Sequence, residues 1–208
     1  MEDRKLSEKE SLDLITQMIH SSKQNMEVGS GNVLLYWGYF TLFLSVVIFA
    51  LVLYTQNPIW SWGWVSMFAV GPVISYKQRG CEPPVVTYTD KTIRKVWQVF
   101  GCMFGLTFVL IALFGGIYKQ VDFILMLPLS LLYCGLGVSI NGIILREKWM
   151  IYSPLIAFVL VVYMLMALIN DELPTVWWYL YFGFSFVVMM IIPGHILNNK
   201  AKKECLKN

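Results

Sequence analysis

Four polar residues stand out because they lie within or beside long apolar runs of the chain. They are Ser75, Ser139, Asn141 and His195. Hydroxyl, amide and imidazole groups near the ends of membrane helices could hydrogen-bond a neutral solute on its way through a bundle. His195 could also act as a base or a haem ligand, although a boundary histidine more commonly makes a single interfacial hydrogen bond. These residues are the candidate polar cluster.

The other reactive residue types give little support for catalysis. The chain has two histidines and four cysteines, and the cysteines form no CxxC or other metal-ligand spacing. The sequence has no HExxH motif, no phosphate-binding glycine loop and no pair of intramembrane carboxylates. A bis-histidine haem would need a second histidine within another span. We therefore predict no catalytic residue, no metal site, no cofactor and no enzymatic activity.

Charged side chains avoid the centres of the apolar runs. Intramembrane Asp, Glu, Lys and Arg are costly, and where they occur they usually mark proton relays or ion pathways. Their absence argues against an ion-coupled pump or a carrier of charged solutes. It leaves a pore for neutral molecules open.

Small residues recur on two of the apolar runs. Gly101 and Gly105 form a GxxxG motif, and a second stripe with intervals of four, three and four consists of Ser130, Cys134, Gly137 and Asn141. Small side chains let membrane helices approach closely, so that dispersion and interhelical hydrogen bonds hold them together. We expect both stripes to pack against another helix, either within a hairpin or in a homo-oligomer.

The composition places these residues in a membrane. Of the 208 residues, 57% are hydrophobic and 14% are charged, whereas about 25% of the residues of a soluble domain are charged. Six apolar runs are long enough to cross a bilayer. The predicted spans are residues 33–54, 60–76, 96–117, 123–145, 149–169 and 175–197. The sequence therefore predicts an all-α integral membrane protein of three helical hairpins, a six-helix bundle.

The return helices of the three predicted hairpins end alike. Each combines a helix-loosening Gly or Pro with a polar group and a cation, at Gly71-Pro72, Gly137 and Pro193-Gly194. Kinked helix ends at matched positions would suit a pseudo-symmetric arrangement. The alternative is that Gly, Pro and Ser are simply common in membrane helices.

The basic residues predict the orientation. Of the 16 Lys and Arg residues, only Lys119 falls in a predicted outer loop. Since short cytoplasmic loops are enriched in Lys and Arg, both termini are expected in the cytosol, with the protein multi-pass in the inner (cytoplasmic) membrane. Contact with anionic lipid is enough to explain the mildly basic face and the basic tail 198–208. We predict no nucleic-acid partner.

Residues 1–30 predict a cytoplasmic amphipathic helix. Ser7-Glu8-Lys9-Glu10 has capping-box spacing, and Gly29-Ser30-Gly31 is expected to end the helix. Between them, apolar residues recur at helical spacing at Leu12, Ile15, Met18, Ile19 and Met26. This helix could bind a cytoplasmic protein partner or dimerise. It could instead lie on the bilayer surface or cover its own bundle.

The start of the chain also resembles a known group of sequences. The pattern is an "I-x-x-M-I" core, then a glycine, then an "L-x-W-G" entry into the first span. In this chain it is formed by Ile15, Met18, Ile19, Gly31, Leu35, Trp37 and Gly38. Over residues 11–39 this pattern is similar to uncharacterised multi-span inner-membrane proteins of Bacteroides-type bacteria. That resemblance implies a role in signalling and brings no particular activity with it.

Two functional hypotheses follow from these patterns. The first is a regulatory or scaffolding membrane protein that acts through its cytoplasmic face, because it has a cytoplasmic helix, short outer turns and no buried charge. The alternative is a small permease or channel for a neutral or lipid-like solute, lined by the candidate polar cluster.

Overall fold

The computed structural model of the chain describes residues 8–68, 88–118, 123–170, 172 and 174–205. Within these ranges every regular element is helical and no strand occurs, so the predicted all-α class is confirmed. The elements are α1 (Glu8–Thr55), η1 (Pro58–Val65), α3 (Tyr88–Tyr118), η2 (Phe123–Leu125), α4 (Met126–Leu145), α5 (Lys148–Ile169), α6 (Trp177–Phe186), the π-helix η3 (Val187–Ile191) and α7 (Ile192–Cys205).

Five of the described segments are long and apolar enough to cross a membrane. They are Gly31–Thr55, Lys91–Ile117, Met126–Leu145, Lys148–Ile169 and Trp177–Lys200. Their bounds agree with five of the six predicted spans to within a few residues, since a long apolar run is a strong signal. The protein is therefore a helical membrane protein.

The predicted second span, residues 60–76, is described only as far as residue 68, and its α-helix begins later than predicted, at residue 66. Residues 58–65 form the 3₁₀-helix η1 instead of the start of an α-helix. Its first turn contains Pro58, and the side chain of Asn57 accepts a hydrogen bond from the backbone N–H of Ile59 at 3.0 Å. This capped, proline-led start favours a tight turn directly after α1. Residues 69–76 lie outside the described ranges.

The predicted helix end at Gly29-Ser30-Gly31 is wrong. α1 runs without a break through these residues for 48 residues, so the boundary predicted at residue 30 lies inside one helix. Glycine weakens a helix by about 1 kcal/mol without removing its backbone hydrogen bonds. Here α7 occupies the space that a side chain at position 31 would fill. A Cβ on Gly31 would lie 3.3 Å from the carbonyl oxygen of Gly194 in α7. The boundary predicted at residue 197 likewise falls inside α7.

The turn between α4 and α5 is as tight as predicted. α4 ends at Leu145, and Arg146 adopts the left-handed conformation, with φ of 57°. The N–H of Glu147 donates to the carbonyl of Gly142 at 2.9 Å, which closes the helix end. α5 begins at Lys148 and packs against α4 at two glycines of α4, Gly135 and Gly142. A Cβ on Gly142 would meet the backbone nitrogen of Ile151 at 2.7 Å.

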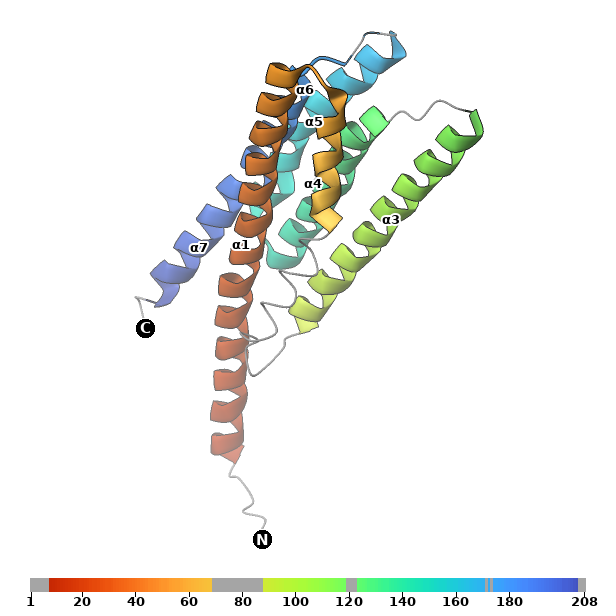
Figure 1. Cartoon of the computed structure of the whole chain (residues 1–208). Coiled ribbons are helices and arrows are strands. Elements are labelled where there is room, and N and C mark those ends of the chain that lie inside the picture. Colours follow the sequence, from red (N-terminus) through yellow and green to blue (C-terminus); the bar gives the residue numbers. More distant parts are fainter. Residues whose placement is uncertain (1–7, 69–87, 119–122, 171, 173, 206–208) are drawn as a thin grey trace.

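The predicted last span consists of three segments. α6 leads into the π-helix η3, which is buried at Met189, Met190 and Ile191, and α7 continues from it. Figure 1 shows α7 leaving the bundle beside α1, with the C-terminus on the same side of the molecule as the N-terminus. A π-turn commonly marks a change of helix direction, and here it precedes Pro193-Gly194 directly.

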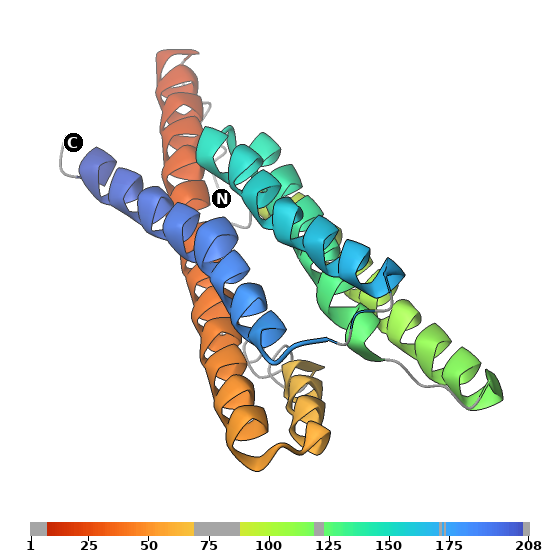
Figure 2. The same cartoon turned by 90° about the horizontal axis from the view of Figure 1, so that it is seen from above.

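The described helices form two groups, which Figure 2 shows side by side. One group holds α1, η1, α6, η3 and α7, and α1 contacts α6 and α7 along much of its length. The other group holds α3, α4 and α5, with α4 and α5 in the most extensive contact. The groups meet chiefly where α5 packs on η3 and α6, and fully buried side chains such as Met164 and Met189 lie in this core.

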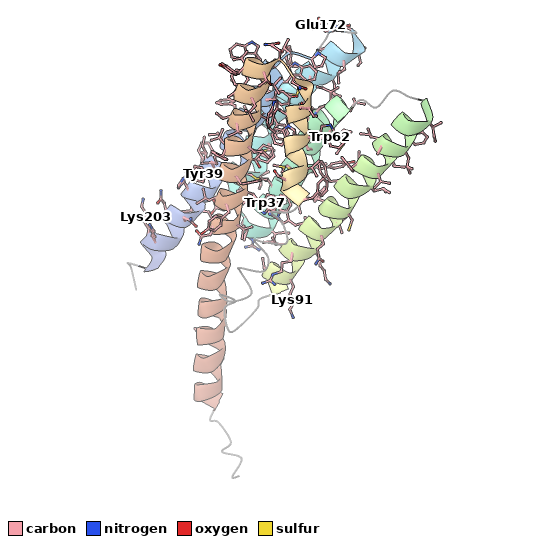
Figure 3. All side chains as sticks on the ribbon, viewed as in Figure 1. Trp37, Tyr39, Trp62, Lys91, Glu172 and Lys203 are labelled. Carbon is pink, nitrogen blue, oxygen red and sulfur yellow. The ribbon has the colours of Figure 1, made fainter. Side chains whose placement is uncertain are left out.

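The described cations gather at one end of the bundle. Figure 3 shows Lys91 and Lys203 at this end and Glu172 at the other. We call it the basic end; its exposed cations include Lys91, Lys95, Arg146, Lys148, Lys202 and Lys203. Segregation of this kind is typical of an integral membrane protein.

The glycines give a direct test of the packing. Gly142→Ala should lower the free energy of unfolding by about 1–3 kcal/mol, because the new methyl group meets the backbone of Met150 and Ile151, which cannot move aside. Thermal unfolding in detergent micelles measures the change. Gly105→Ala is the matched control, since nothing lies within 4 Å of its added carbon. Equal effects at the two positions would contradict the observed packing.

Candidate functional site

The candidate polar cluster does not form one site in the described part of the structure. Ser139 Oγ donates to the backbone carbonyl of Ile151 at 3.2 Å, within the α4–α5 pair. His195 is exposed on α7, and its Nε2 is 2.7 Å from the hydroxyl of Tyr39 on α1. No hydrogen bond joins the described members of the cluster, and Ser75 lies outside the described residues. The geometry of His195 fits the interfacial interpretation.

Asn141 differs from the other members of the cluster. Its side chain is only 3% exposed, and its Oδ1 has no hydrogen-bond partner. Ser153 on α5 is 7% exposed, and its Oγ also lacks a partner. Buried polar atoms in native structures are nearly always hydrogen-bonded, to protein or to water. Thr41 Oγ1 on α1 and Trp64 Nε1 on η1 are likewise buried without a partner in the described part of the chain.

The two predicted small-residue stripes have different surroundings. On α4, a Cβ on Gly137 would lie 3.2 Å from the ring of Trp97 in α3, so Gly137 lets this tryptophan approach. Ser130 is buried and donates to the carbonyl of Leu127 at 2.9 Å, while Cys134 is partly buried against the core. By contrast, nothing lies within 4 Å of a Cβ built on Gly101 or Gly105. The close packing predicted for this GxxxG motif is not seen within the described chain.

A third stripe was not predicted, and it lines the contact of α1 with α6, η3 and α7. It follows α1 at alternating intervals of three and four residues, and every member is buried: Gly31, Leu34, Gly38, Thr41, Ser45 and Ile48. We call it the α1 seam. A Cβ on Gly38 would lie 2.7 Å from Ile191 of η3, and one on Gly183 of α6 would lie 2.5 Å from Ser45. The sequence signal was present, because small residues recur every seven positions.

Near Gly31 and Gly194, α1 and α7 cross, and polar side chains bridge the two helices there. Asn198 Nδ2 donates to Oδ1 of Asn32 at 2.9 Å, and Tyr39 bonds His195 one to two turns further along α1. Asn198 also lies against Gly31, where an added Cβ would meet its side-chain oxygen. The crossing fixes the direction in which α1 leaves the bundle.

An ion pair joins α7 to the α4–α5 turn at the basic end. Lys200 Nζ donates to both carboxylate oxygens of Glu147, at 2.7 and 2.5 Å. Glu147 is 15% exposed and precedes α5, while Lys200 is 50% exposed. Of the two acidic residues whose side chains the structure describes, Glu172 lies at the opposite end (Figure 3). Among the side chains that the structure describes, Glu147 is thus the single acid at the basic end.

The opposite end is held by aromatic packing. Ser45 donates to the backbone carbonyl of Tyr179, whose hydroxyl is 2.6 Å from Ser61 Oγ. Trp64 packs edge-to-face on Phe182, with ring centroids 4.8 Å apart. Each of these contacts joins α6 to α1 or η1, so this network is structural.

No group of three or more His, Cys, Asp or Glu side chains in the described ranges could hold a metal ion. At the basic end, the α1–α7 crossing and the Glu147–Lys200 ion pair bring polar side chains of different helices together.

The unpartnered amide of Asn141 provides a sharp test. Asn141→Leu should raise the free energy of unfolding by about 1 kcal/mol, because an apolar group of similar shape removes a buried oxygen without a hydrogen bond. Ser139→Ala is the matched control on the same helix. It should lower the free energy of unfolding by about 0.6 kcal/mol through loss of the bond to Ile151. Chemical unfolding in micelles measures both; a destabilising Asn141→Leu would show that Asn141 has a partner in the folded protein.

Comparison of this chain with protein-family models, with curated proteins and with solved structures found no match.

Proposed function

We propose that the protein is a regulatory or scaffolding membrane protein without enzymatic activity that presents the first half of α1 to a protein partner. The observation that carries the proposal is the length and direction of α1. Figure 1 shows its N-terminal part reaching well beyond the other described helices. We call residues 8–30 of this helix the arm.

The dimensions of α1 require an arm outside the bilayer. At 1.5 Å per residue, the helix is about 72 Å long, whereas the hydrocarbon core of a bilayer is about 30 Å thick. The membrane-crossing part of α1, Gly31–Thr55, accounts for its second half. The arm therefore extends about 34 Å as a helix beyond the apolar segment.

The arm has the sequence of a helix that binds in a groove. Leu12, whose side chain is described, is 64% exposed. Ile15, Met18 and Ile19 share its face by helical spacing, an i, i+3, i+6, i+7 pattern typical of helices that insert one face into an apolar groove. A cytosolic protein with such a groove is the partner that this face suits, and a second copy of the arm is the other candidate.

Charge supports a cytosolic location for the arm. The N-terminal part of α1 and the C-terminal part of α7 leave the bundle at the basic end (Figure 1). In a multi-pass inner-membrane protein, the end rich in Lys and Arg faces the cytosol. Both termini are then cytosolic, and anionic lipid would contact the exposed cations.

A permease for a neutral or lipid-like solute is the second candidate function. The observation that favours it is the buried, unpartnered oxygen of Asn141. The hydrogen bonds of Ser139 to the α5 backbone and of His195 to Tyr39 favour a structural role for these two residues instead.

The arm can be tested by crosslinking in native membranes. Leu12→Asp combined with Ile15→Asp should remove the captured protein partner, because two charges on the apolar face cannot enter an apolar groove. Crosslinking from a photoreactive residue at position 16, followed by mass spectrometry, measures the capture. Gln17→Glu with Gln24→Glu is the control, since these positions lie on the opposite face by spacing. An unchanged set of captured proteins in the Leu12/Ile15 variant would contradict the proposal.

The orientation makes a separate prediction. In intact cells, a cysteine at Ser11 should be protected from a membrane-impermeant maleimide until the inner membrane is permeabilised. A cysteine at Thr175, which is exposed near the start of α6, should react before permeabilisation. Mass-tag gel shifts on a background without native cysteines measure both. The reverse pattern would place the arm in the periplasm.

A further inference from the structure

The two helix groups are joined unequally along their length. Extensive contact exists where α5 packs on η3 and α6, whereas α5 and α7 contact each other only slightly. Figure 2 shows α7 diverging from the group that contains α4 and α5. η3 lies between α6 and α7 in the chain. The two helix groups are therefore packed together where α5 meets η3 and α6, and much less where α5 meets α7.

The ion pair bridges the weakly joined part. Glu147 belongs to the turn between α4 and α5, and Lys200 lies near the end of α7. Both carboxylate oxygens accept from the ammonium group, but Lys200 is half exposed, so solvent screens the attraction. A partly exposed ion pair of this kind can break and re-form readily.

The turn that carries Glu147 has a strained residue. Arg146 adopts φ of 57°, an uncommon conformation for a residue other than glycine. Such residues are frequent in switch regions, where the surrounding structure holds them in place. The side chain of Glu147 makes no capping hydrogen bond to α5, so its described polar contact is the one with Lys200.

Two buried oxygens without partners lie between the ion pair and the π-helix contact. On α5, Ser153 lies between Glu147 and the residues Ala157 and Met164, whose face it shares by helical spacing. On α4, Asn141 lies one turn before the helix end. Neither Ser153 Oγ nor Asn141 Oδ1 has a hydrogen-bond partner. If the α4–α5 turn and α7 separated, water could hydrogen-bond to these two oxygens.

We propose that the Glu147–Lys200 ion pair is a latch that closes the basic end of a two-part bundle. When the pair breaks, α7 moves away from the α4–α5 turn about the π-helix, and water enters to Asn141 and Ser153. Through its bond to Asn32, Asn198 on α7 links this movement to α1. The latch is a property of the bundle and does not depend on partner binding to the arm.

The test measures the reactivity of a cysteine at position 153. In proteoliposomes of the full-length chain without native cysteines, Ser153→Cys is exposed on both sides of the membrane to a charged, membrane-impermeant maleimide. Glu147→Gln should raise the labelling rate about two- to fivefold, the shift expected from losing a partly exposed ion pair. Glu147→Lys combined with Lys200→Glu should return the rate to that of the parent.

Matched controls separate the latch from general loosening. Glu172→Gln removes an exposed acid at the other end and should leave labelling at position 153 unchanged. Ala157→Cys, one turn further toward the π-helix contact, should stay protected in every variant. The proposal is overturned if Glu147→Gln leaves the rate at position 153 unchanged, if the charge exchange fails to restore it, or if position 157 becomes equally reactive.

Discussion

The close contact of α1 with α6, η3 and α7 is the interaction on which the rest of the structure depends. In a bilayer, apolar side chains gain nothing by leaving lipid, so helices associate through tight packing and interhelical hydrogen bonds. The α1 seam meets this requirement with Gly31, Gly38 and Ser45, which let the partner helices approach to van der Waals distance. The same contact fixes the arm, because α1 crosses α7 at the point where it leaves the bundle.

The membrane class and most helix bounds could be predicted from the sequence because hydropathy over twenty residues is a strong signal. The turn at residues 146–148 was also predictable, since charged residues interrupt an apolar run there. The predicted helix end at Gly29-Ser30-Gly31 failed for a different reason. Local propensity cannot show whether a glycine ends a helix or lets another helix pack closely against it. Gly31 lets α7 pack against α1.

The choice among small-residue stripes was likewise beyond the sequence. Gly101 and Gly105 match the familiar GxxxG motif, but a Cβ built on either would meet no described atom of another helix within 4 Å. The α1 seam, with a seven-residue repeat, packs against its neighbours instead. Which stripe is used depends on how helices distant in sequence are arranged. The sequence also could not show the hydrogen-bond partners of the candidate polar cluster: Ser139 bonds the backbone of α5 and His195 bonds Tyr39 of α1. Ser153 was not singled out, and its Oγ, like Oδ1 of Asn141, is buried without a described partner.

The polar side chains of the two ends differ in part. Toward the α6 start, Ser45, Ser61 and Tyr179 are joined by hydrogen bonds within aromatic packing, while Trp64 Nε1 is buried there without a described partner. Toward the basic end they are either exposed bridges between helices, as at Glu147 and Lys200, or buried and unpartnered, as at Asn141. At the basic end α7 is thus joined closely to α1, and to the α4–α5 group chiefly through the ion pair.

The α1 seam also has a consequence for biosynthesis. Ser45 and its partner Tyr179 are 134 residues apart, and Tyr39 and His195 are 156 residues apart. α1 is translated before α6, η3 and α7, which cover its seam. During synthesis the seam faces lipid or the insertion machinery until these helices have entered the membrane. A chain that stops after α5 leaves the seam uncovered, and cellular quality control can recognise such incomplete products by it.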